Sequence, residues 1–421
     1  MAVTRSTVQA AAAAAARRGV TLGALATFLS VTAASVSFPF LTARRDALGC
    51  DALCQGGQTS LRSALTLVGA TLIGRASDRF GRIPMLWLGL FASLVALSIH
   101  RSMDTIQGMW LAIVPSALLN QTFSVMKATF SDYIQTTGGT EADRAGAIGR
   151  LGMAVGLSFM AGPLLGTWLA SDYAQSLKLS AAMYAMYGAV LYFLPAPAAG
   201  GRSPNADGGG GCGGITAFAR LPVLRERGVQ MLMALRLAMA LAFHMYAPIW
   251  QVSLKSRFNF GPSDHARFMG VIGGTYALSQ GFLARMLVEA SARHPTALVL
   301  GCIFSLGGAR PFAFWTSSVE VVYILYVPMV VALGVMNTAI ATATTRLAGK
   351  DQVGGLFGLL ESVESVAGMV GPSVGGLISR SRGANATLIA VCGCYASAFA
   401  LVVAFGHLLW PSAKKSQRKA D

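Results

Sequence analysis

Twelve separate stretches of this 421-residue chain are long and apolar enough to cross a lipid bilayer as helices. A spanning helix needs about 20 mostly apolar residues, and its backbone groups must be satisfied internally because the hydrocarbon layer holds no water. The stretches lack the short polar–apolar alternation of barrel strands. They cover residues 19–43, 60–76, 83–100, 105–126, 151–171, 179–194, 228–254, 268–284, 295–309, 321–345, 353–379 and 383–413. The sequence therefore predicts an all-α integral membrane protein with twelve transmembrane helices.

The charge composition argues against the soluble classes of protein. Charged residues make up 12% of the chain and hydrophobic residues 54%, whereas soluble proteins carry about 25% charged residues. A net charge of +16 would suggest a nucleic-acid partner in a soluble protein. Here the basic residues lie between the apolar stretches, which indicates contact with a lipid bilayer and no nucleic-acid partner.

A glycine-rich segment at 208–214 divides the twelve stretches into six and six. Glycine tracts of this kind act as flexible linkers. We therefore expect two six-helix bundles related by a pseudo-twofold axis. The predicted parts are a cytoplasmic segment at 1–18, a first bundle at 19–194, a cytoplasmic linker at 195–227, a second bundle at 228–410 and a basic cytoplasmic tail at 411–421.

The distribution of basic residues predicts the orientation. Lys and Arg are more frequent in the segments on the side of the N-terminus than in those on the opposite side. Since basic residues in short loops favour the cytoplasmic side, both termini and the linker are expected there. The sequence does not distinguish the plasma membrane from an organellar membrane.

The two halves share a glycine–proline motif at a constant offset of 209 residues. Its members are Gly162, Pro163 and Gly166 in the fifth stretch and Gly371, Pro372 and Gly375 in the eleventh. Glycines at this spacing let helices approach closely, and a proline bends its helix by removing a backbone hydrogen bond. Transporters are commonly built from such repeated halves, with the solute site near the midplane between them. Ordinary packing of small residues is the alternative interpretation.

The segment after the second stretch carries a charged motif with glycines near both ends. Its residues are Gly74, Asp78, Arg79, Gly81 and Arg82. This segment, read together with the twelve spans in two sets of six, resembles the cytoplasmic signature of the major facilitator superfamily. Within that family the chain looks most like the drug:proton antiporter branch, which includes tetracycline-efflux proteins and an animal organic-cation-transporter-like solute carrier.

The resemblance implies a gate on the cytoplasmic side. Asp78 would interact with the positive N-terminal end of the eleventh helix, near Gly354. Arg82 would pair with Asp132 at the end of the fourth span, and the two glycines of the motif would permit a tight turn. A solvated charged turn is the alternative.

The chain departs from the antiporter branch at the positions linked there to proton coupling. Ile113 and Val114 stand early in the fourth span, where that branch has an arginine, and the first span has no acidic residue. The resemblance therefore implies a transporter fold without locating a proton site.

Two glutamates lie deep within the eleventh stretch. Glu361 and Glu364 lie about 12 and 16 Å along a helix that begins at Val353, and a spacing of three residues places them on one face. Since two neighbouring carboxylates cannot both ionise cheaply away from water, we expect one of them to hold a proton near neutral pH. They would couple protons or bind a cationic solute. The alternative is a structural ion pair with Arg236 or Lys127.

Other polar residues within the spans are further candidates for coupling or solute binding. They are Arg236, Lys127, Asn120, Gln121, His244, Gln280 and Asn337. Interhelical hydrogen bonds are the alternative role for the uncharged members, and the two cations could reach the membrane surface along their own side chains.

The sequence contains no catalytic triad, HExxH motif or phosphate-binding loop. We therefore predict no enzymatic activity, no cofactor and no metal site. Cys50 and Cys54 share a loop, where they either form a disulfide or stay free, and a zinc site would lack ligands.

Taken together, these features predict a monomeric secondary active transporter of a small organic, drug-like solute that works by alternating access. The deep carboxylates favour a cationic solute and protons as the coupling ion. The alternatives are an uncoupled facilitator for a sugar or metabolite, and a non-transporting receptor or scaffold of the same fold.

Overall fold

The structure is a computed structural model that describes residues 2–136, 141–196, 226–347 and 353–410. Within these ranges the side chains of residues 2–13, 136, 141–146, 148 and 353–355 are also outside the description. Most of the predicted linker at 195–227 and the whole tail at 411–421 therefore lie outside the described residues, as do the side chains near Gly354 at the start of the eleventh predicted helix.

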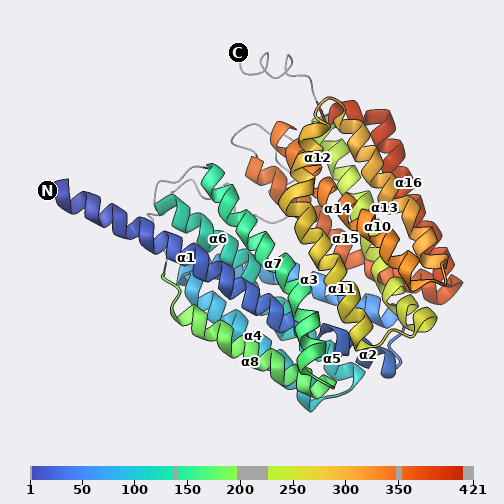
Figure 1. The fold of residues 1–421 in the computed structure, drawn as a ribbon, viewed down its shortest axis with the longest axis horizontal. Coiled ribbons are helices and arrows are strands. Elements are labelled where there is room, and N and C mark those ends of the chain that lie inside the picture. Colours follow the sequence, from blue (N-terminus) through green and yellow to red (C-terminus); the bar gives the residue numbers. More distant parts are fainter. Residues whose placement is uncertain (1, 137–140, 197–225, 348–352, 411–421) are drawn as a thin grey trace. The chain divides into compact units, whose positions relative to one another are not determined.

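The described residues of the first half of the chain form six helical runs (Figure 1). They are α1 (Ala2–Val36) with α2 (Phe38–Ala47), α3 (Ala52–Phe80), α4 (Arg82–Ser102), α5 (Ile106–Leu119) with α6 (Thr122–Thr136), α7 (Glu141–Leu169) and α8 (Tyr173–Tyr192). Side chains cap three of these helices: the Asp51 carboxylate accepts the Cys54 N–H at 2.8 Å, the Thr105 hydroxyl accepts the Gly108 N–H at 3.1 Å, and the Asp172 carboxylate accepts the Gln175 N–H at 2.7 Å. Such caps satisfy backbone donors that the first turn of a helix leaves free.

In the second half, the part of the chain from residue 226 onward that the structure describes forms six more runs. They are α10 (Arg227–Phe258), α11 (Pro262–Leu278) continued by the π-helical turn η3 (Ser279–Leu283) and α12 (Ala284–Ala290), α13 (Pro295–Trp315), α14 (Val319–Leu347), α15 (Val353–Arg382) and α16 (Ala384–Phe405) with the short η4 (Gly406–Leu408). The predicted all-α fold with twelve spans is confirmed in the described part of the chain.

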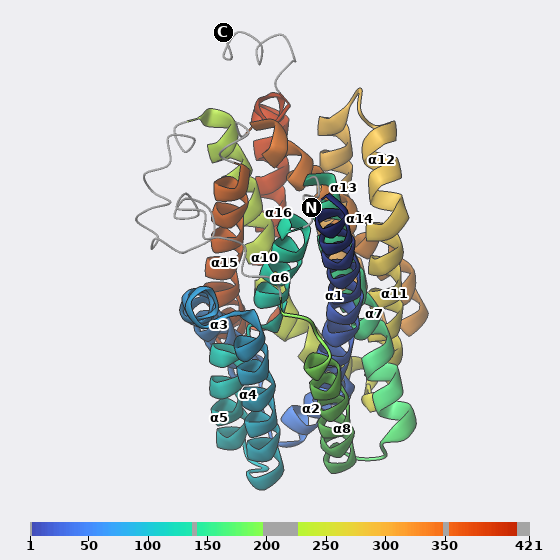
Figure 2. The same ribbon diagram turned by 90° about the vertical axis from the view of Figure 1, so that its left-hand side faces the viewer.

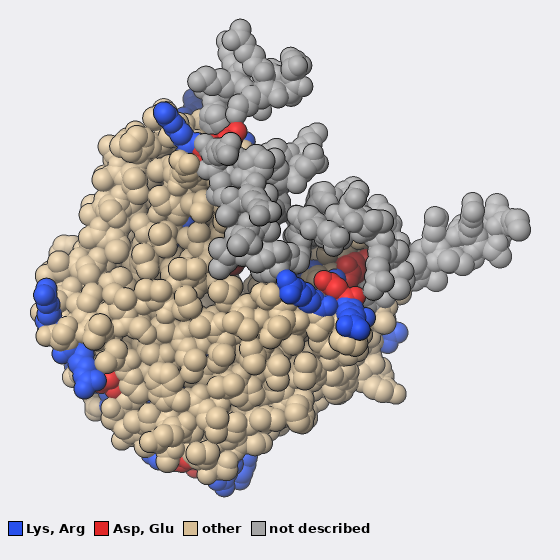
Figure 3. All heavy atoms as spheres, turned by 180° about the vertical axis from the view of Figure 1, so that it is seen from behind, with Lys and Arg blue, Asp and Glu red and all other residues tan. Residues whose placement is uncertain are grey.

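Eight of the twelve runs meet a length and hydropathy criterion for a membrane span among the described residues. The other four are α3, α8, the α11–α12 run and α15. In α15 the two glutamates lower the mean hydropathy of a helix that is still 30 residues long. On the face shown in Figure 3, charged side chains are sparse across the middle and gather toward the edges, as a lipid-facing surface requires.

The helices group by contact into two compact units. The described residues of the first unit fall within 1–48, 65–206 and 261–274, and those of the second within 49–64, 207–260 and 275–421. In the first unit α1 packs on α7, α8 and α6, and α4 packs on α5 and α8 (Figure 2). In the second unit α10 packs on α15 and α16, and α13 packs on α14 and α16.

Each unit also includes a helical segment from the other half of the sequence. The start of α3 belongs to the second unit, where a Cβ atom added at Gly376 of α15 would lie 2.6 Å from the Ala52 carbonyl oxygen. The start of α11 belongs to the first unit, where a Cβ atom at Gly273 would lie 2.9 Å from the Met160 nitrogen of α7. Backbones approach this closely only where side chains are absent. The predicted division into bundles at 19–194 and 228–410 follows the sequence, whereas this grouping follows contacts, so the predicted division stays a prediction.

The glycine–proline motif lies where helices cross closely within each unit. In α7, a Cβ atom at Gly162 would overlap the Ser35 hydroxyl of α1. In α15, a Cβ atom at Gly371 would lie 2.8 Å from the His244 Cβ of α10. Adding 209 to 162 and to 35 gives 371 and 244, so one offset relates the two glycines and also their contact partners.

The second glycine of each motif repeats this relation. A Cβ atom at Gly166 would overlap the Val36 carbonyl oxygen, and one at Gly375 would overlap the Met245 carbonyl oxygen. Val36 and Met245 are again 209 residues apart. The repeat predicted from the glycine–proline motif thus extends to the α1–α7 and α10–α15 contacts.

The turn between α3 and α4 differs from the expected loop. The residues of the charged motif up to Phe80 continue α3 as a helix, and the chain turns at Gly81 alone, whose φ is 94°. A left-handed φ favours glycine because it lacks a Cβ atom. Gly74 lies inside the helix with open space where its Cβ would be, so the expected role of Gly74 in a tight turn is not met.

Helix α13 is six residues longer than the ninth predicted stretch and takes in Arg310. A span that ended at residue 309, as the sequence predicts, would leave Arg310 in the following loop. Arg310 is instead 4% exposed inside the second unit. Its guanidinium stacks on Tyr246 at 4.4 Å and on Tyr395 at 5.1 Å, and it donates to the Tyr395 hydroxyl at 2.9 Å. Its Nε–H donates to the Leu306 carbonyl at 3.1 Å. Aromatic faces and neutral acceptors thus replace a carboxylate as the partners of a buried cation.

We expect Arg310→Lys to lower the free energy of unfolding by about 1–3 kcal/mol, because lysine cannot stack on two rings and donate to Tyr395 at once. Thermal unfolding of the detergent-solubilised protein measures the change. Arg380→Lys, at an exposed position near the end of α15, is the matched control. An unchanged midpoint for Arg310→Lys would contradict the importance of the stacking.

We expect Gly375→Ala to destabilise the protein by about 2 kcal/mol or more, because the added methyl group meets a backbone carbonyl that cannot move aside. Gly393→Ala in α16, with open space around the glycine, should have little effect. Equal melting temperatures for the two variants would show that α10 and α15 are not in close contact at this position.

Candidate solute site

A carboxylate in the middle of α15 joins two basic side chains of α10. The Glu364 Oε2 atom lies 3.2 Å from Arg236 Nε, and its Oε1 atom lies 3.2 Å from His244 Nε2. Arg236 and His244 are eight residues apart on α10, about two helical turns, so Glu364 bridges them along one face. The side chain of Arg236 is 22% exposed, that of His244 19% and that of Glu364 30%, so the cluster is half-buried.

The α10–α15 crossing leaves room for the histidine ring. A Cβ atom at Gly368 would lie 3.3 Å from His244 Cε1, and Gly371 faces the His244 Cβ. Larger side chains at these two glycines would push the ring away from Glu364. The glycines of α15 therefore do more than bring helices together, since they also seat one member of the charged cluster.

Polar side chains extend the cluster to α14 and α11. Arg236 Nη1 donates to Asn337 Oδ1 at 3.2 Å, and Asn337 Nδ2 donates to the Tyr276 hydroxyl at 3.3 Å. Gln280 donates to the same hydroxyl at 3.3 Å and to the Gly334 carbonyl at 3.3 Å. Gln280 lies in the π-helical turn η3, an irregularity that is frequent at functional sites.

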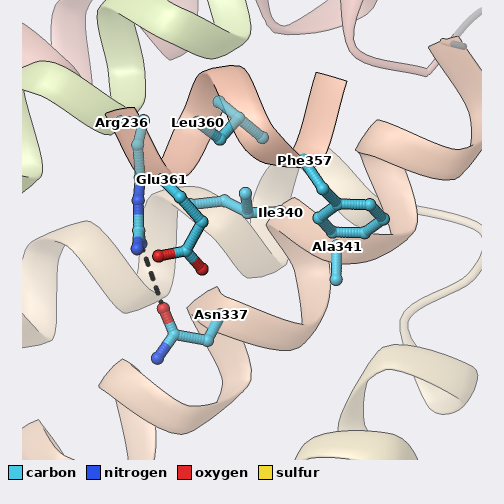
Figure 4. Close-up of a pocket in the computed structure, with 7 residues that line it drawn as sticks. All are labelled: Arg236, Asn337, Ile340, Ala341, Phe357, Leu360 and Glu361. Atoms are coloured by element: carbon cyan, nitrogen blue, oxygen red, sulfur yellow. Dashed lines mark hydrogen bonds between the residues drawn. The ribbon is translucent and has the colours of Figure 1, made fainter. Parts of the chain in front are cut away.

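Glu361, the second deep carboxylate, lies beside this network but outside it. Among the described residues its carboxylate takes part in no ion pair or side-chain hydrogen bond. It lines a cavity of about 270 Å³ together with Arg236, Asn337, Ile340, Ala341, Phe357 and Leu360. Figure 4 shows the Glu361 carboxylate on the same side as the Arg236 guanidinium and Asn337. The site thus offers one unpaired carboxylate against an otherwise largely apolar wall.

The cluster is present in only one of the two repeated halves. Subtracting 209 from the four charged or titratable positions leads to Gly152, Val155, Thr27 and Ser35, which carry no charge. The repeat fixes the helix crossing in both halves, whereas the ionisable groups are confined to the second. Because ionisable groups inside a membrane are costly, this departure from the repeat marks α10 and α15 as the candidate site.

The predicted gate residues of the first unit do come together. Arg82 Nε donates to Asp132 Oδ2 at 3.0 Å, and its Nη1 lies 2.5 Å from Asp78 Oδ1 and 2.6 Å from the Ser77 hydroxyl. Arg79 stacks on the neighbouring Phe80 ring at 5.4 Å. The expected contact of Asp78 with the start of α15 involves side chains outside the description and stays a prediction.

Lys127 and Asn120, the other candidates, belong to the first unit. Lys127 stacks on the Phe123 ring at 4.4 Å. Asn120 lies in the break between α5 and α6, where it donates to the Ser93 hydroxyl at 2.7 Å and accepts the Thr122 hydroxyl at 2.7 Å. Both residues therefore make these contacts within the first unit, whereas the Glu364 cluster belongs to the second.

Sequence reasoning placed His244 among several polar candidates but did not pair it with Glu364. A signal was present in the sequence, because the 209-residue offset matches His244 to Ser35 and Glu364 to Val155, so both positions depart from the repeat. Cys50, just before α3, and Cys54, in the first turn of α3, form a disulfide. Of the two alternatives that the sequence left open, a disulfide or free thiols, the structure has the disulfide. In the described residues no group of His, Cys, Asp and Glu is arranged to hold a metal ion.

A bundle of twelve long helices with a half-buried ionisable cluster and an adjoining cavity defines the class of multi-pass membrane transporters. The comparisons with known proteins agree with this class. A family model described as Major Facilitator Superfamily matches residues 23–372. The chain belongs to the major facilitator superfamily, and it is a secondary transporter and not an enzyme.

Relatives and a solved structure extend this assignment. Human solute carrier family 67 member A1 is 25% identical over 82% of this chain and 81% of its own length. The class G tetracycline resistance protein of Vibrio anguillarum is 25% identical over 75% of this chain and 78% of its own length. The crystal structure of the human organic anion transporter MFSD10 (TETRAN) covers 92% of this chain and 99% of its own with a TM-score of 0.68 at 21% identity, and therefore shows the shared fold. The resemblance to tetracycline-efflux proteins and solute carriers is confirmed.

We expect Glu364→Gln to lower the free energy of unfolding by about 1–3 kcal/mol, because it leaves Arg236 and His244 without their shared carboxylate. Glu361→Gln removes a carboxylate that has no partner and should leave stability unchanged or slightly raised. Thermal unfolding without added solute compares the two variants in the same helix. Equal destabilisation by both would contradict the different roles that the contacts assign to them.

Proposed function

We propose that this transporter moves a small cationic organic solute across the membrane in exchange for protons. The observation that carries the proposal is the unpaired Glu361 carboxylate in the cavity beside Phe357, Ile340 and Leu360. A carboxylate attracts the charged end of an organic cation, and an aromatic ring and aliphatic side chains accept its apolar part. A cavity of about 270 Å³ suits a small solute.

The relatives support transport of organic molecules but differ in the charge that their names indicate. One is named for tetracycline resistance, and the solved structure is titled as that of an organic anion transporter. The charge of the site itself favours a cation here. Arg236, the only cationic side chain among the lining residues, is already engaged with Glu364 and Asn337. An anion would have to displace Glu364 from Arg236, whereas a cation finds Glu361 without a partner.

Alternating access would use the motifs described above. We propose that the Arg82 cluster closes the cytoplasmic side and that the close glycine crossings keep each half rigid while the halves move, with both termini in the cytoplasm. Asn337 and Gln280 would link α14 and η3 to the state of Arg236. These roles are supported by the contacts at Arg82 and at the motif glycines.

We expect the protein in vesicles to accumulate small organic cations when a pH gradient is imposed, and Glu361→Gln to reduce this accumulation at least about tenfold, because the counter-charge of the solute is lost. Uptake of a panel of cations, anions and neutral sugars of similar size, with and without the gradient, is the measurement. Glu289→Gln, at an exposed ion pair with Arg285 in α12, is the matched control.

Uptake of sugars at the same rate with and without the pH gradient would instead support an uncoupled facilitator. Absence of flux for every compound would support a receptor or scaffold. Either result would overturn the proposed exchange.

A further inference from the structure

His244 is a titratable group that the proposed transport reaction leaves without a role. It faces Glu364 at 3.2 Å, and the oxygen it contacts is the one that Arg236 does not use. A neutral imidazole beside a carboxylate places its Nε2–H toward the oxygen, which leaves Nδ1 as the acceptor that can take a further proton. The ring is half-buried, with its side chain 19% exposed, so it is held in place by packing and remains partly open to solvent.

We propose that His244 takes up the coupling proton, and that this proton and a monovalent organic cation at Glu361 replace each other one for one. The inference rests on the proposed function and names the residue and the stoichiometry. It follows from the charges that the contacts bring together. With His244 neutral and both glutamates ionised, one arginine faces two carboxylates, and the cluster carries one uncompensated negative charge.

The position of that uncompensated charge is given by the contacts. Glu364 is held by Arg236, so the free negative charge lies on Glu361, in the wall of the cavity. A monovalent cation in the cavity would bring the cluster to neutrality. A proton on His244 would do the same from the other end, because the imidazolium then balances Glu364. Half-buried clusters favour neutrality, since the low dielectric strengthens uncompensated fields.

Arg236 connects the two ends of the cluster. It touches Glu364 through Nε and lines the cavity next to Glu361. When a protonated His244 balances Glu364, the attraction of Arg236 for Glu364 is no longer needed to compensate that carboxylate. The guanidinium can then neutralise Glu361 across the cavity wall, and the bound cation is released. His244 is thus a coupling residue that acts through Glu364 and Arg236 without contacting the solute.

The described elements packed against α10 carry few charged or titratable groups near His244. From α15 the facing groups are Glu364 and, beyond it, Glu361. The part of α3 in this unit contributes the Ser63 hydroxyl near Gly368 and one charged residue, the exposed Arg62. α14 and α16 carry no Asp, Glu, Lys, Arg or His between Glu320 and Arg346 or between Ala384 and Phe405, and Tyr395 of α16 stacks on Arg310. The short η4 carries His407 at the far end of α16.

One proton moving one way for one monovalent cation moving the other leaves no net charge transferred. A pH gradient of one unit can then support a cation gradient of about tenfold at most, and membrane potential should have no effect on it. Electroneutral exchange separates this proposal from exchange with two protons per cation, which would respond to potential.

The full-length protein in vesicles tests the proposal with benzyltrimethylammonium as the cation and phenylacetate as an anion of similar size. Accumulation is measured under an imposed pH gradient with the potential clamped, and under an imposed potential without a pH gradient. We expect the wild-type protein to accumulate the cation in response to pH alone. His244→Gln keeps an N–H donor for Glu364 but cannot take a proton. Under a pH gradient the variant should therefore only equalise the cation concentration across the membrane, while its affinity for the cation changes less than about twofold.

His294→Gln, at an exposed histidine before α13, is the matched control and should behave as the wild type. Because His244 packs on motif glycines and its variant could fold poorly, a second measurement uses the wild-type protein. Adding benzyltrimethylammonium to the detergent-solubilised protein in weak buffer should release up to one proton per bound cation near neutral pH.

Gradient-driven accumulation that survives in His244→Gln, accumulation that follows membrane potential in the wild type, or no proton release on binding would each overturn the proposal. These results differ from failure of the proposed function itself. In that case the wild-type protein would not accumulate the cation under any pH gradient, or would accumulate phenylacetate in its place.

Discussion

The close approach of helix pairs at glycine is the constraint on which the rest of the structure depends. In α1–α7 and in α10–α15 the backbones come so near that even a methyl group at Gly166 or Gly375 would overlap a carbonyl oxygen. Within a bilayer, helices gain little from hydrophobic association, so packing at this distance is a main source of cohesion. It also fixes which residues of the partner helix face the glycines. In the second half one of those residues is His244, and the position of the charged cluster follows from it.

The charged cluster is a consequence of this geometry and of the need to compensate charge away from water. Glu364 can bridge Arg236 and His244 because all three lie along the α10–α15 crossing. Arg310 shows a second solution in the same unit, with aromatic faces and a tyrosine hydroxyl as partners of a cation. The two arginines differ in what they leave available. Arg310 is enclosed on all sides, whereas Arg236 borders a cavity next to a carboxylate that has no partner.

The fold was largely predictable from the sequence, because span length and the glycine–proline repeat are both local patterns. The errors arose where helices extend past the end of an apolar stretch. Arg310 was placed outside the membrane because a charge normally ends a span, and only the ring stacking of Tyr246 and Tyr395 shows why it does not. The residues of the charged motif were expected in a loop, yet they continue α3 because Gly81 alone supplies the turn.

The candidate site was predictable in part, and the reason lies in the difference between composition and contact. Glu361 and Glu364 stand out in the sequence because two carboxylates in an apolar helix are costly. Their separate roles cannot be predicted from the sequence, since a spacing of three residues places both on the same face of the helix. Only the contacts show that Glu364 is paired and Glu361 is not. The 209-residue offset gives a partial remedy, because it matches His244 to Ser35 and Glu364 to Val155. Where one half of a duplicated chain keeps small neutral residues and the other has a linked acid, base and histidine, the difference cannot be explained by the packing that both halves share. The proposed exchange of charge with a solute, assigned to the second half alone, would account for the difference.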